Sequence, residues 1–455
     1  MKLRLEHIKK VFFIGIGGIG MSALARYFNY RGCSVFGYDR LESGLTKKMQ
    51  EEGMKISYGD KVENIPIAFN KPTKESLVVY TPAVSQNTHI ISELKRRGFD
   101  MYKRSAVLGL ISQNKFTIAI AGTHGKTTTS TLTAHILRYA GVECSAFLGG
   151  ISTNYGSNAW FSETDVMVVE ADEYDRSFLS LRPDIAVITS MEADHLDIYN
   201  DYNELVSSFK QFLARGKPGN KRIIKAGLPI KGEISYGIDD ESADVKAKDI
   251  EVKKGSFYFT YQDDLGEAKQ IYLAMPGYHN VENALAAISV AKLLNIDMKT
   301  ITDALSSFRG VKRRFEYVVK NQNHIYIDDY AHHPEEVKSF LNSVKKMYPK
   351  KFLTVVFQPH LYSRTQDFAD DFATALALAD KLLLLEIYPA RELPIEGVTS
   401  DWLLEKVKVQ QKEVLSNESV LDRIAVEKPE LIVTMGAGNI DRLVEPIKKL
   451  LIGNE

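Results

Sequence analysis

The first hundred residues alternate between strand patterns and a helix pattern. An apolar run over 11–14 is followed by a glycine loop, a helix pattern over 21–30 and a second strand pattern over 33–39. A further buried-strand run, 76–80, ends in the polar turn 81–85. Strand, glycine loop, helix and strand in this order predict one half of a Rossmann-type α/β domain.

A second α/β segment begins at another buried-strand pattern, 116–121, which a second glycine-containing loop follows. Two more apolar runs, 166–170 and 185–189, end in polar residues, and functional groups are expected at such strand ends in open α/β sheets. From 221 to 275, charged stretches with short apolar runs predict a small antiparallel insert. A helix pattern over 281–294 follows the insert.

The last third of the chain again alternates strand and helix patterns. Its buried-strand runs are 325–327, 353–357, 382–385 and 431–434. Helical stretches separate these runs, which is the order of an α/β domain. The chain is therefore predicted to contain three successive α/β segments.

Composition narrows the class of protein. The chain has 455 residues, of which 44% are hydrophobic and 25% charged, as is ordinary for a globular protein of several domains. A formal net charge of zero gives no electrostatic reason to expect nucleic acid or an anionic membrane as a partner. The two cysteines, Cys33 and Cys144, argue against a disulfide framework and fit a reducing compartment.

The segment 9–25 superficially resembles a signal peptide, with two lysines before an apolar run. Four glycines interrupt that run, and a second strand pattern then completes a βαβ unit. No apolar stretch approaches the roughly 20 residues that a membrane-spanning helix needs. We therefore expect a cytoplasmic protein without membrane insertion.

The first glycine loop carries Gly15, Gly17, Gly18 and Gly20, and Asp39 ends the next strand. This GxGxxG spacing is typical of a loop that binds a diphosphate, with the acidic residue accepting a hydrogen bond from a ribose hydroxyl. From this loop alone, NAD or FAD, another diphosphate ligand and a purely structural turn all remain open.

The second loop places a lysine before threonines, which typically binds a triphosphate and its magnesium ion. Its residues are Gly122, Thr123, His124, Gly125, Lys126, Thr127 and Thr128. Backbone N–H groups of the following helix would surround phosphate oxygens, Lys126 would offset their charge and Thr127 would ligate Mg²⁺. Ile120 occupies the position of the usual first glycine, so the loop is a shortened relative of the Walker loop. A threonine-rich turn without a ligand is the alternative.

A magnesium–phosphate site needs carboxylates, and acidic segments follow two of the predicted strands. Glu170 ends one strand and opens the acidic run 170–175, which by itself is more often a solvated loop. Beside a nucleotide loop, we expect Glu170 to ligate the metal. His195, flanked by acids after the next strand, either ligates a second Mg²⁺ or has a structural role. The two loops together suggest an enzyme that spends ATP on a substrate carrying a diphosphate.

Further polar clusters follow. Asn280 and Asn283 precede or begin a helix, where they would bind a base edge or cap the helix. Arg314 would supply a cation to a transferring phosphoryl group, unless it belongs to an exposed basic patch. The segments 328–333 and 358–364 are histidine-containing strand ends that would suit zinc, although they lack the usual zinc spacings.

Taken together, these motifs resemble those of the Mur ligases of peptidoglycan synthesis, over essentially the whole chain. The segments that carry the resemblance are 15–25, 122–128, 170–173, 194–195, 279–284, 314–316, 329–334, 358–365 and 436–440. The resemblance implies a Rossmann-like UDP-sugar-binding domain over 1–103 and a P-loop ATPase-like domain over 104–310, with the antiparallel insert. A Rossmann-like domain over 311–455 would bind the amino acid and close over the nucleotide. The protein would be a monomer or a homodimer.

The implied reaction is an ATP-dependent ligation with Mg²⁺ as cofactor. The lactyl carboxylate of UDP-N-acetylmuramate would attack the γ-phosphate of ATP, and the amine of L-alanine would then attack the acyl phosphate and release phosphate. Positioning and charge neutralisation would supply most of the catalysis. A ligase that recycles a murein tripeptide onto the same sugar is the alternative within the family. From other classes, an NAD-dependent oxidoreductase leaves the second loop unexplained, and a non-catalytic nucleotide-binding regulator also remains.

The resemblance also implies residue roles. The implied catalytic residues are Lys126, His195, Arg314, His332 and Arg364. The implied ATP contacts are Gly122, Thr123, His124, Gly125, Lys126, Thr127, Thr128, Asn280, Asn283, Arg314 and Asp329, and the implied metal ligands are Thr127, Glu170 and His195. The implied UDP-sugar contacts are Gly15, Gly17, Gly18, Gly20, Asp39 and Ser85. Tyr330, His332, His360 and Arg364 would bound the amino acid, with Arg364 pairing with its carboxylate.

Two positions depart from the family pattern. Ser190 stands where asparagine is more usual, and Arg391 replaces a more usual glycine. We expect both to be tolerated. Other Mur ligases use a carbamylated lysine after the Asp-His motif, and we do not expect Lys210, the nearest candidate here, to have that role.

Overall fold

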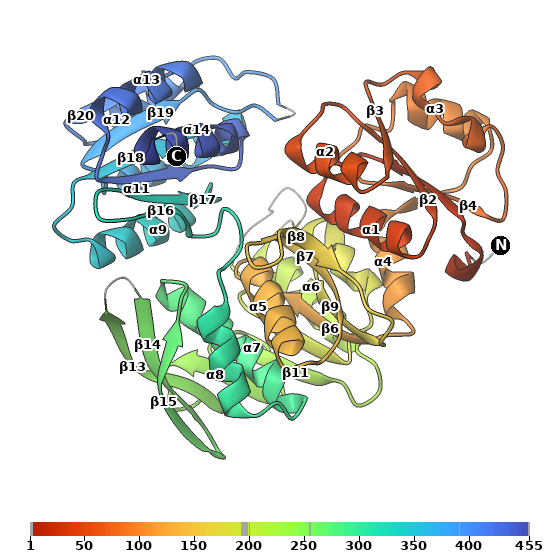
Figure 1. Ribbon diagram of the computed structural model, residues 1–455, viewed down its shortest axis with the longest axis horizontal. Helices are drawn as coiled ribbons and strands as arrows, with labels where there is room; N and C mark the ends of the chain where they lie inside the picture. The colour runs from red at the N-terminus through yellow and green to blue at the C-terminus, as the bar shows by residue number, and fades with distance from the viewer. Residues whose placement is uncertain (1–2, 193–198, 200, 254–255, 391, 454–455) are drawn as a thin grey trace. The chain divides into compact units, whose positions relative to one another are not determined.

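The computed structural model describes residues 3–192, 199, 201–253, 256–390 and 392–453 (Figure 1). The described chain forms two compact units. Unit 1 contains residues 1–250, 259–272 and 279–308, and unit 2 contains residues 251–258, 273–278 and 309–455. Three sheets with flanking helices confirm the predicted α/β fold class. Among the described helices, none is long and apolar enough to cross a membrane.

The first sheet is parallel throughout and has the strand order β3-β2-β1-β4-β5. Its strands are β1 (Lys10–Ile14), β2 (Ser34–Asp39), β3 (Lys55–Tyr58), β4 (Ser76–Tyr80) and β5 (Met101–Lys103). The helices of this part are α1 (Ile19–Tyr30), α2 (Gly44–Glu51), α3 (His89–Arg96) and α4 (Arg104–Ser112), with short 3₁₀ turns η1 (Leu5–His7), η2 (Val62–Asn64) and η3 (Ile67–Phe69). This order is that of the predicted Rossmann half.

Burial on both faces explains why β1 has no polar alternation. Val11 and Phe13 pack into the core that also receives α1, whereas Phe12 and Ile14 pack into a second core with α3. Parallel strands covered on both faces are expected to be almost continuously apolar. The polar glycine loop can follow only where β1 ends, and so it lies at the carboxyl edge of the sheet.

The second sheet has ten strands in the order β15-β14-β13-β12-β11-β10-β6-β9-β7-β8. Its first six strands along the chain are β6 (Phe116–Ala121), β7 (Ser145–Ser152), β8 (Ser157–Trp160), β9 (Val166–Glu170), β10 (Ile185–Ile188) and β11 (Lys221–Lys225). The remaining strands are β12 (Ile234–Ile238), β13 (Val245–Lys253), β14 (Ser256–Asp263) and β15 (Gly266–Leu273). Its helical segments are α5 (Lys126–Tyr139), η4 (Tyr174–Ser180), α6 (Tyr202–Ala214), α7 (Tyr278–Leu293) and α8 (Met298–Ser307).

The antiparallel insert is smaller than the charged pattern over 221–275 predicted. The strands β11, β12 and β13 pair in parallel and continue the central sheet. The antiparallel geometry belongs to β14 and β15, which are sheet neighbours joined by only two residues. The second half of β13 is mostly exposed, and these solvated positions gave it the alternating, charged pattern of an antiparallel strand.

The first two sheets share one hydrophobic core within unit 1. Tyr27 of α1 packs against Phe147 of β7 and against Phe161, with ring centroids 5.7 and 5.6 Å apart. Asn158 of β8 donates a hydrogen bond to the carbonyl of Ile19 at 2.6 Å and accepts one from Arg26 of α1. The start of α1, which follows the first glycine loop, is therefore fixed against the second sheet.

The third sheet lies in unit 2 and has the order β16-β17-β21-β18-β19-β20. Its strands are β16 (Glu316–Lys320), β17 (Ile325–Asp329), β18 (Leu353–Phe357), β19 (Lys381–Leu385), β20 (Gln411–Leu415) and β21 (Leu431–Met435). The helical segments are α9 (Pro334–Met347), α10 (Tyr362–Asp367), α11 (Ala369–Leu376), α12 (Ser400–Lys406), α13 (Asn417–Glu427), η5 (Asn439–Leu443) and α14 (Val444–Ile452). Only the edge strand β16 runs antiparallel to its neighbour.

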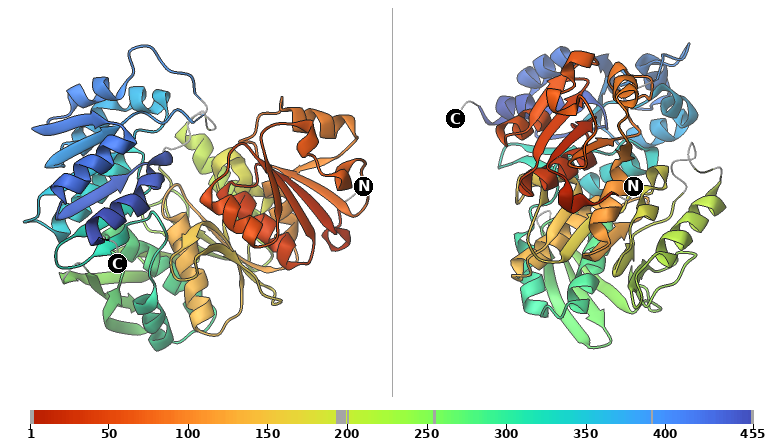
Figure 2. Two further views of the ribbon diagram at one scale, coloured as in Figure 1. Left: turned by 45° about the horizontal axis from the view of Figure 1, so that its top comes forward. Right: turned by 90° about the vertical axis from the view of Figure 1, so that its right-hand side faces the viewer.

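Helices cover both faces of this third sheet (Figure 2). The helices α9, α11 and α12 pack on one face, and α13 and α14 pack on the other. Alternate residues of one strand supply the two cores, as Val355 and Val356 of β18 do. The polar segments that follow β17, β18 and β21 therefore leave the sheet at one edge, because these three strands are parallel.

Candidate active site

The second glycine loop joins β6 to α5 in a backbone conformation that requires its glycines. Gly122 has φ +139° and Gly125, the N-cap of α5, has φ +81°. A Cβ atom at Gly122 would lie 2.1 Å from the Thr189 hydroxyl oxygen, and one at Gly125 would lie 2.5 Å from Oδ1 of Asn283. Glycine is needed here both for positive φ and for close approach of neighbouring side chains.

Inside this loop, the Lys126 ammonium donates three hydrogen bonds. Its acceptors are the carbonyls of Gly122 at 2.6 Å and Thr123 at 3.2 Å, and the carboxylate of Glu173 at 2.8 Å. Burial alone would lower the pKa of Lys126, but the carboxylates of Glu173, Asp172 and Glu170 outweigh burial and raise it. Burial raises the pKa of Glu173 to about 7, although Lys126 opposes this shift.

Ser190, the departure from the family pattern, binds the loop directly. Its hydroxyl accepts a hydrogen bond from the His124 N–H at 2.7 Å and lies 3.0 Å from the Thr123 hydroxyl. The Thr123 hydroxyl in turn accepts from the backbone N–H of Glu192 at 3.0 Å. The short side chain of Ser190 therefore connects the segment that follows β10 to the second glycine loop.

The two asparagines of α7 lie beside the loop. Both are buried, and Nδ2 of Asn283 donates to Oδ1 of Asn280 at 3.1 Å. Oδ1 of Asn283 accepts from the Thr129 hydroxyl of α5 at 3.1 Å. Asn283 thus links α7 to the helix that follows the loop. The predicted contact of these residues with adenosine stays a prediction.

Glu170 is the last residue of β9, and its carboxylate accepts a hydrogen bond from the Gly149 N–H at 2.9 Å. A Cβ atom at Gly149 would lie 2.1 Å from a carboxylate oxygen of Glu170, so a side chain there would displace this carboxylate. Thr127, in the first turn of α5, is buried. Hydroxyl and carboxylate oxygens are the ligands that Mg²⁺ prefers alongside phosphates, so these two side chains fit the predicted metal.

Two predicted positions lie outside the described residues, namely His195 and Arg391. Their predicted roles stay predictions. Within the described residues, no group of three or more histidine, cysteine or acidic side chains could by itself hold a metal ion.

The first glycine loop binds the side chain of Asp39. Gly15 has φ +83°, and a Cβ atom there would lie 2.7 Å from Thr81. Oδ2 of Asp39 accepts from the Gly17 N–H at 2.7 Å, and Oδ1 accepts from the Arg40 N–H at 2.7 Å. The carboxylate thus holds the loop closed, and its contact with a ribose hydroxyl stays a prediction.

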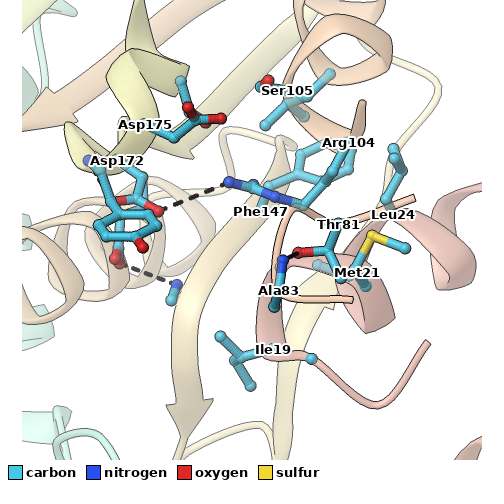
Figure 3. Close-up of a pocket in the computed structure, with 18 of the residues that line it drawn as sticks. Ile19, Met21, Leu24, Thr81, Ala83, Arg104, Ser105, Phe147, Asp172 and Asp175 are labelled. Carbon is cyan, nitrogen blue, oxygen red and sulfur yellow. Dashed lines mark hydrogen bonds and ion pairs between the residues drawn. The ribbon is translucent and has the colours of Figure 1, made fainter. Parts of the chain in front are cut away.

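A pocket of about 270 Å³ lies between this loop and the second sheet, within unit 1 (Figure 3). The residues that line it include Gly18, Gly20 and Met21 of the loop and α1, Thr81, Arg104, Gly149, Glu170, Asp172 and Asp175. The pocket therefore joins the predicted diphosphate loop to the predicted metal ligand Glu170. Ser85, predicted near the sugar nucleotide, is in the same turn as Thr81 but is not one of the lining residues.

Arg104 is a site residue that the sequence motifs did not reveal. Its guanidinium lies 3.7 Å from the Asp172 carboxylate, and Figure 3 shows it reaching across the pocket. A Cβ atom at Gly20 would lie 2.9 Å from Nη1 of Arg104, so the missing side chain makes room for this arginine. The only available signal was its position directly after β5.

The acidic loop after β9 has an unusual backbone. Asp175 and Arg176 both have φ near +50°, a region that non-glycine residues rarely occupy. The Asp175 carboxylate pairs with Lys103 at 2.9 Å. Adjacent residues at the β5–α4 junction, Lys103 and Arg104, therefore both contact this loop.

In unit 2, Asp329, Tyr330 and His332, which were predicted to contact the nucleotide or the amino acid, lie at the end of β17 and directly after it. The Asp329 carboxylate accepts from the backbone N–H groups of Phe315 and Ala331, both at 2.7 Å. Burial raises the pKa of Asp329 to about 6. The rings of Tyr330 and His332 lie 5.1 Å apart, and those of His332 and His360 lie 6.0 Å apart.

The surroundings of His332 favour its neutral form. Its Nδ1–H donates to the Tyr330 carbonyl at 2.9 Å. Burial lowers the pKa of His332; Glu336 opposes this shift, and Arg364 of α10 adds to it. With Nδ1 acting as the donor, Nε2 of the neutral ring carries a lone pair that can accept a proton.

Gln358 fixes the histidine segment that follows β18. Its amide donates to Oδ1 of Asn439 at 2.8 Å, and its carbonyl oxygen accepts from the Ile440 N–H at 2.9 Å. Two of the motifs that carry the family resemblance, 358–365 and 436–440, are therefore locked together. Leu361, next to His360, has φ +72° and is held by a backbone hydrogen bond to Tyr388 at 2.9 Å.

Arg313 and Arg314, indistinguishable in the sequence, have different environments. Arg313 pairs with the fully buried Asp328 at 3.2 Å and also donates to the Gly436 carbonyl. Burial raises the pKa of Asp328 to about 7, although Arg313 opposes this shift. The guanidinium groups of Arg313 and Arg314 both lie 5.2 Å from the ring centre of Tyr330, so the pairing with Asp328 is what distinguishes Arg313.

These environments predict that substitutions of Arg313 and Arg314 differ in their effects on stability and on turnover. Arg313→Met leaves a buried carboxylate without its partner, and we expect it to lower the free energy of unfolding by about 3 kcal/mol. Arg314 acts on the buried Asp329 through its charge, so Arg314→Met should lower the melting temperature less than Arg313→Met does, and should lower ATP-dependent turnover. Thermal melting and turnover of both variants check this, and equal melting temperatures would contradict it.

Comparison with known proteins gives the same family for each part of the chain. The Mur ligase family catalytic domain matches residues 10–116, the Mur ligase middle domain matches 120–291, and the Mur ligase glutamate ligase domain matches 313–438. The UDP-N-acetylmuramate–L-alanine ligase of Christiangramia forsetii is 46% identical, over 98% of this chain and 99% of its own. The enzyme of the same name from Porphyromonas gingivalis is 44% identical, over 98% and 99%.

Two solved structures share the fold over nearly the full length. The UDP-N-acetylmuramate–alanine ligase of Thermotoga maritima is 26% identical with a TM-score of 0.85, over 96% of this chain and 98% of its own. A murein peptide ligase from Psychrobacter arcticus is 25% identical with a TM-score of 0.71, over 98% and 99%. By its sequence over nearly its whole length, the chain belongs to the Mur ligase family.

Proposed function

We propose that the protein joins L-alanine to the lactyl carboxylate of UDP-N-acetylmuramate, with conversion of ATP to ADP and phosphate. The observation that carries this proposal is the pocket that connects the first glycine loop to Glu170 beside the second loop. A diphosphate on the first loop and a triphosphate on the second would then present a carboxylate to a γ-phosphate. The names of the relatives at 44–46% identity support the choice of substrates.

The nucleotide would bind at the second loop. Backbone N–H groups at the start of α5 would hold the phosphates, and Lys126 would neutralise their charge. Thr127 and Glu170 would hold Mg²⁺, which supplies charge stabilisation to the transferring phosphoryl group. Residues 104–310 thus form the ATP-binding domain of this proposal.

The sugar nucleotide would bind in the domain of residues 1–103. The glycine loop would hold its diphosphate, with Asp39 near the uridine. Arg104 supplies a guanidinium inside the pocket, where planar donors suit phosphate or carboxylate oxygens. Ser85 would lie near the same ligand.

Two steps would then follow, and each forms one bond and breaks one. A lactyl carboxylate oxygen attacks the γ-phosphorus, the bond to the β-phosphate oxygen breaks, and an acyl phosphate forms. The alanine nitrogen attacks the acyl carbon, and the carbon–oxygen bond to phosphate breaks. Lys126 and Arg314 would stabilise the charge on the transferring group, because positioned cations act strongly at such centres.

The domain of residues 311–455 would hold the amino acid. An ammonium group must lose a proton before it can attack, and the neutral His332 offers Nε2 as the acceptor. Arg364 would pair with the alanine carboxylate, and Tyr330 and His360 would bound the same site. Asp329 would contact adenosine.

Arg364 offers a test of this assignment. Arg364→Lys keeps the charge but loses the planar pair of donors that binds a carboxylate. We expect the KM for L-alanine to rise about tenfold to a hundredfold, with the KM for ATP unchanged. Steady-state kinetics with each substrate varied in turn measure this. A rise in the KM for ATP alone would place Arg364 elsewhere.

The murein tripeptide ligase is the second candidate, because a protein of that type shares this fold with a TM-score of 0.71. The deciding experiment mixes the protein, ATP, Mg²⁺ and UDP-N-acetylmuramate with single amino acids or with a tripeptide, and follows phosphate release. We expect release with L-alanine and little with the tripeptide. No phosphate release with any amino acid or with the tripeptide would reject the proposal. Release with the tripeptide alone would favour the second candidate.

A further inference from the structure

The lysine of the nucleotide loop is already fully engaged by the protein itself. Its three ammonium hydrogens have three acceptors, the carbonyls of Gly122 and Thr123 and the carboxylate of Glu173. The side chain of Lys126 is 13% exposed and that of Glu173 is 0% exposed. A phosphate group that takes this ammonium must therefore displace at least one protein acceptor.

Glu173 is the acceptor that a phosphate most directly replaces, because both are anions whereas the loop carbonyls are neutral. The backbone that carries Glu173 is held in place: its carbonyl accepts from the hydroxyl of the fully buried Tyr199 at 2.7 Å and from the Arg176 N–H at 2.9 Å. The carboxylate therefore cannot follow the lysine far when the ammonium moves toward a ligand.

We propose that Glu173 is a positioning residue that competes with the nucleotide for Lys126. It holds the ammonium while the loop is empty, which spares the protein a buried cation without a partner. It then recaptures the ammonium as the nucleotide leaves, which lowers affinity for the product ADP and speeds its release. This inference rests on the proposed function in that the loop must bind ATP and ADP.

The decisive variant is Glu173→Gln, which keeps the size and an acceptor oxygen but removes the charge. In the empty loop, this change leaves Lys126 without its hydrogen-bonded carboxylate, whereas in the filled loop the phosphates supply a negative charge. We therefore expect the Kd for MgADP to fall at least about tenfold. The matched control is Glu204→Gln, because Glu204 pairs with Arg176 of the same loop and not with Lys126.

A second comparison shows whether the effect passes through Lys126. In a Lys126→Met background, Glu173→Gln should leave the Kd for MgADP unchanged, because the contested ammonium is absent. Calorimetric titration of the full chain with MgADP measures the wild type, both single variants, the double variant and the Glu204→Gln control. The inference is overturned by an unchanged or raised Kd in the folded Glu173→Gln variant, or by the same gain in the Lys126→Met background.

If Glu173→Gln does not fold, Glu173→Asp retracts the carboxylate by one methylene and should lower the Kd by a smaller factor. Loss of folding in both variants would overturn the inference, because Glu173 would then be a structural element. The titrations contain no sugar nucleotide and no amino acid. Normal MgADP binding without alanine-dependent phosphate release would therefore reject the proposed reaction. The competition between Glu173 and the nucleotide for Lys126 could still be measured in that case.

Discussion

Replacing Lys126 with methionine is expected to reduce alanine-dependent phosphate release by at least about a thousandfold, because it removes the cation of the nucleotide loop. The lysine lies inside the loop, its ammonium within hydrogen-bonding distance of two loop carbonyls. Methionine retains most of the aliphatic length, so the loss concerns charge. The remaining partner Glu173 is buried with a raised pKa and can take up a proton, which limits the structural cost.

The measurement is a steady-state rate with ATP, UDP-N-acetylmuramate and L-alanine at saturation, together with a melting curve. Lys74→Met is the control, because Lys74 is exposed on the surface of the first α/β part. A Lys126→Met protein that melts normally and keeps more than a tenth of the wild-type rate would show that the loop does not carry the chemistry.

Replacing Glu170 with glutamine should lower the rate about a hundredfold to a thousandfold and raise the Mg²⁺ concentration needed for half-maximal activity. Glutamine keeps an oxygen that can accept from the Gly149 N–H, so the local backbone is preserved. What disappears is the negative charge that attracts the cation. The expected signature is therefore a change in metal dependence as well as in rate.

A titration of activity against Mg²⁺ distinguishes this role from a purely structural one. Asp165→Asn serves as the control, because that carboxylate is 81% exposed at the start of the same strand region. Unchanged Mg²⁺ dependence in Glu170→Gln, with any loss of rate, would remove Glu170 from the metal site.

The parts of the site that lie within one strand–loop–helix unit were predictable from the sequence. The glycines at 15 and 122 have positive φ, and their loops follow buried strands as the apolar runs indicated. Such features depend on local backbone geometry, which residue types encode directly. The α/β order of the three sheets was predictable for the same reason.

Residues that act through contacts distant in sequence were not predictable from their own motifs. Glu173 reaches Lys126 because the neighbouring parallel strands β9 and β6 end at the same edge of the second sheet. Arg104 reaches Asp172 from a different sheet, because Arg104 follows β5 of the first sheet and Asp172 follows β9 of the second. Nothing in the local pattern separates Arg313, which pairs with a buried carboxylate, from Arg314. The parallel pairing of β11 to β13 was missed because these interior strands are only partly buried, and their charged exposed positions resemble those of antiparallel strands.

If ATP activates the lactyl carboxylate as an acyl phosphate, one carboxylate oxygen must be transferred to the released phosphate. UDP-N-acetylmuramate labelled with ¹⁸O in its lactyl carboxylate would be turned over with ATP, Mg²⁺ and L-alanine, and the released phosphate examined by mass spectrometry. We expect one labelled oxygen from the carboxylate in each phosphate, since the attacking oxygen leaves with phosphorus. Phosphate without the label, released at the same rate as the amide forms, would contradict it.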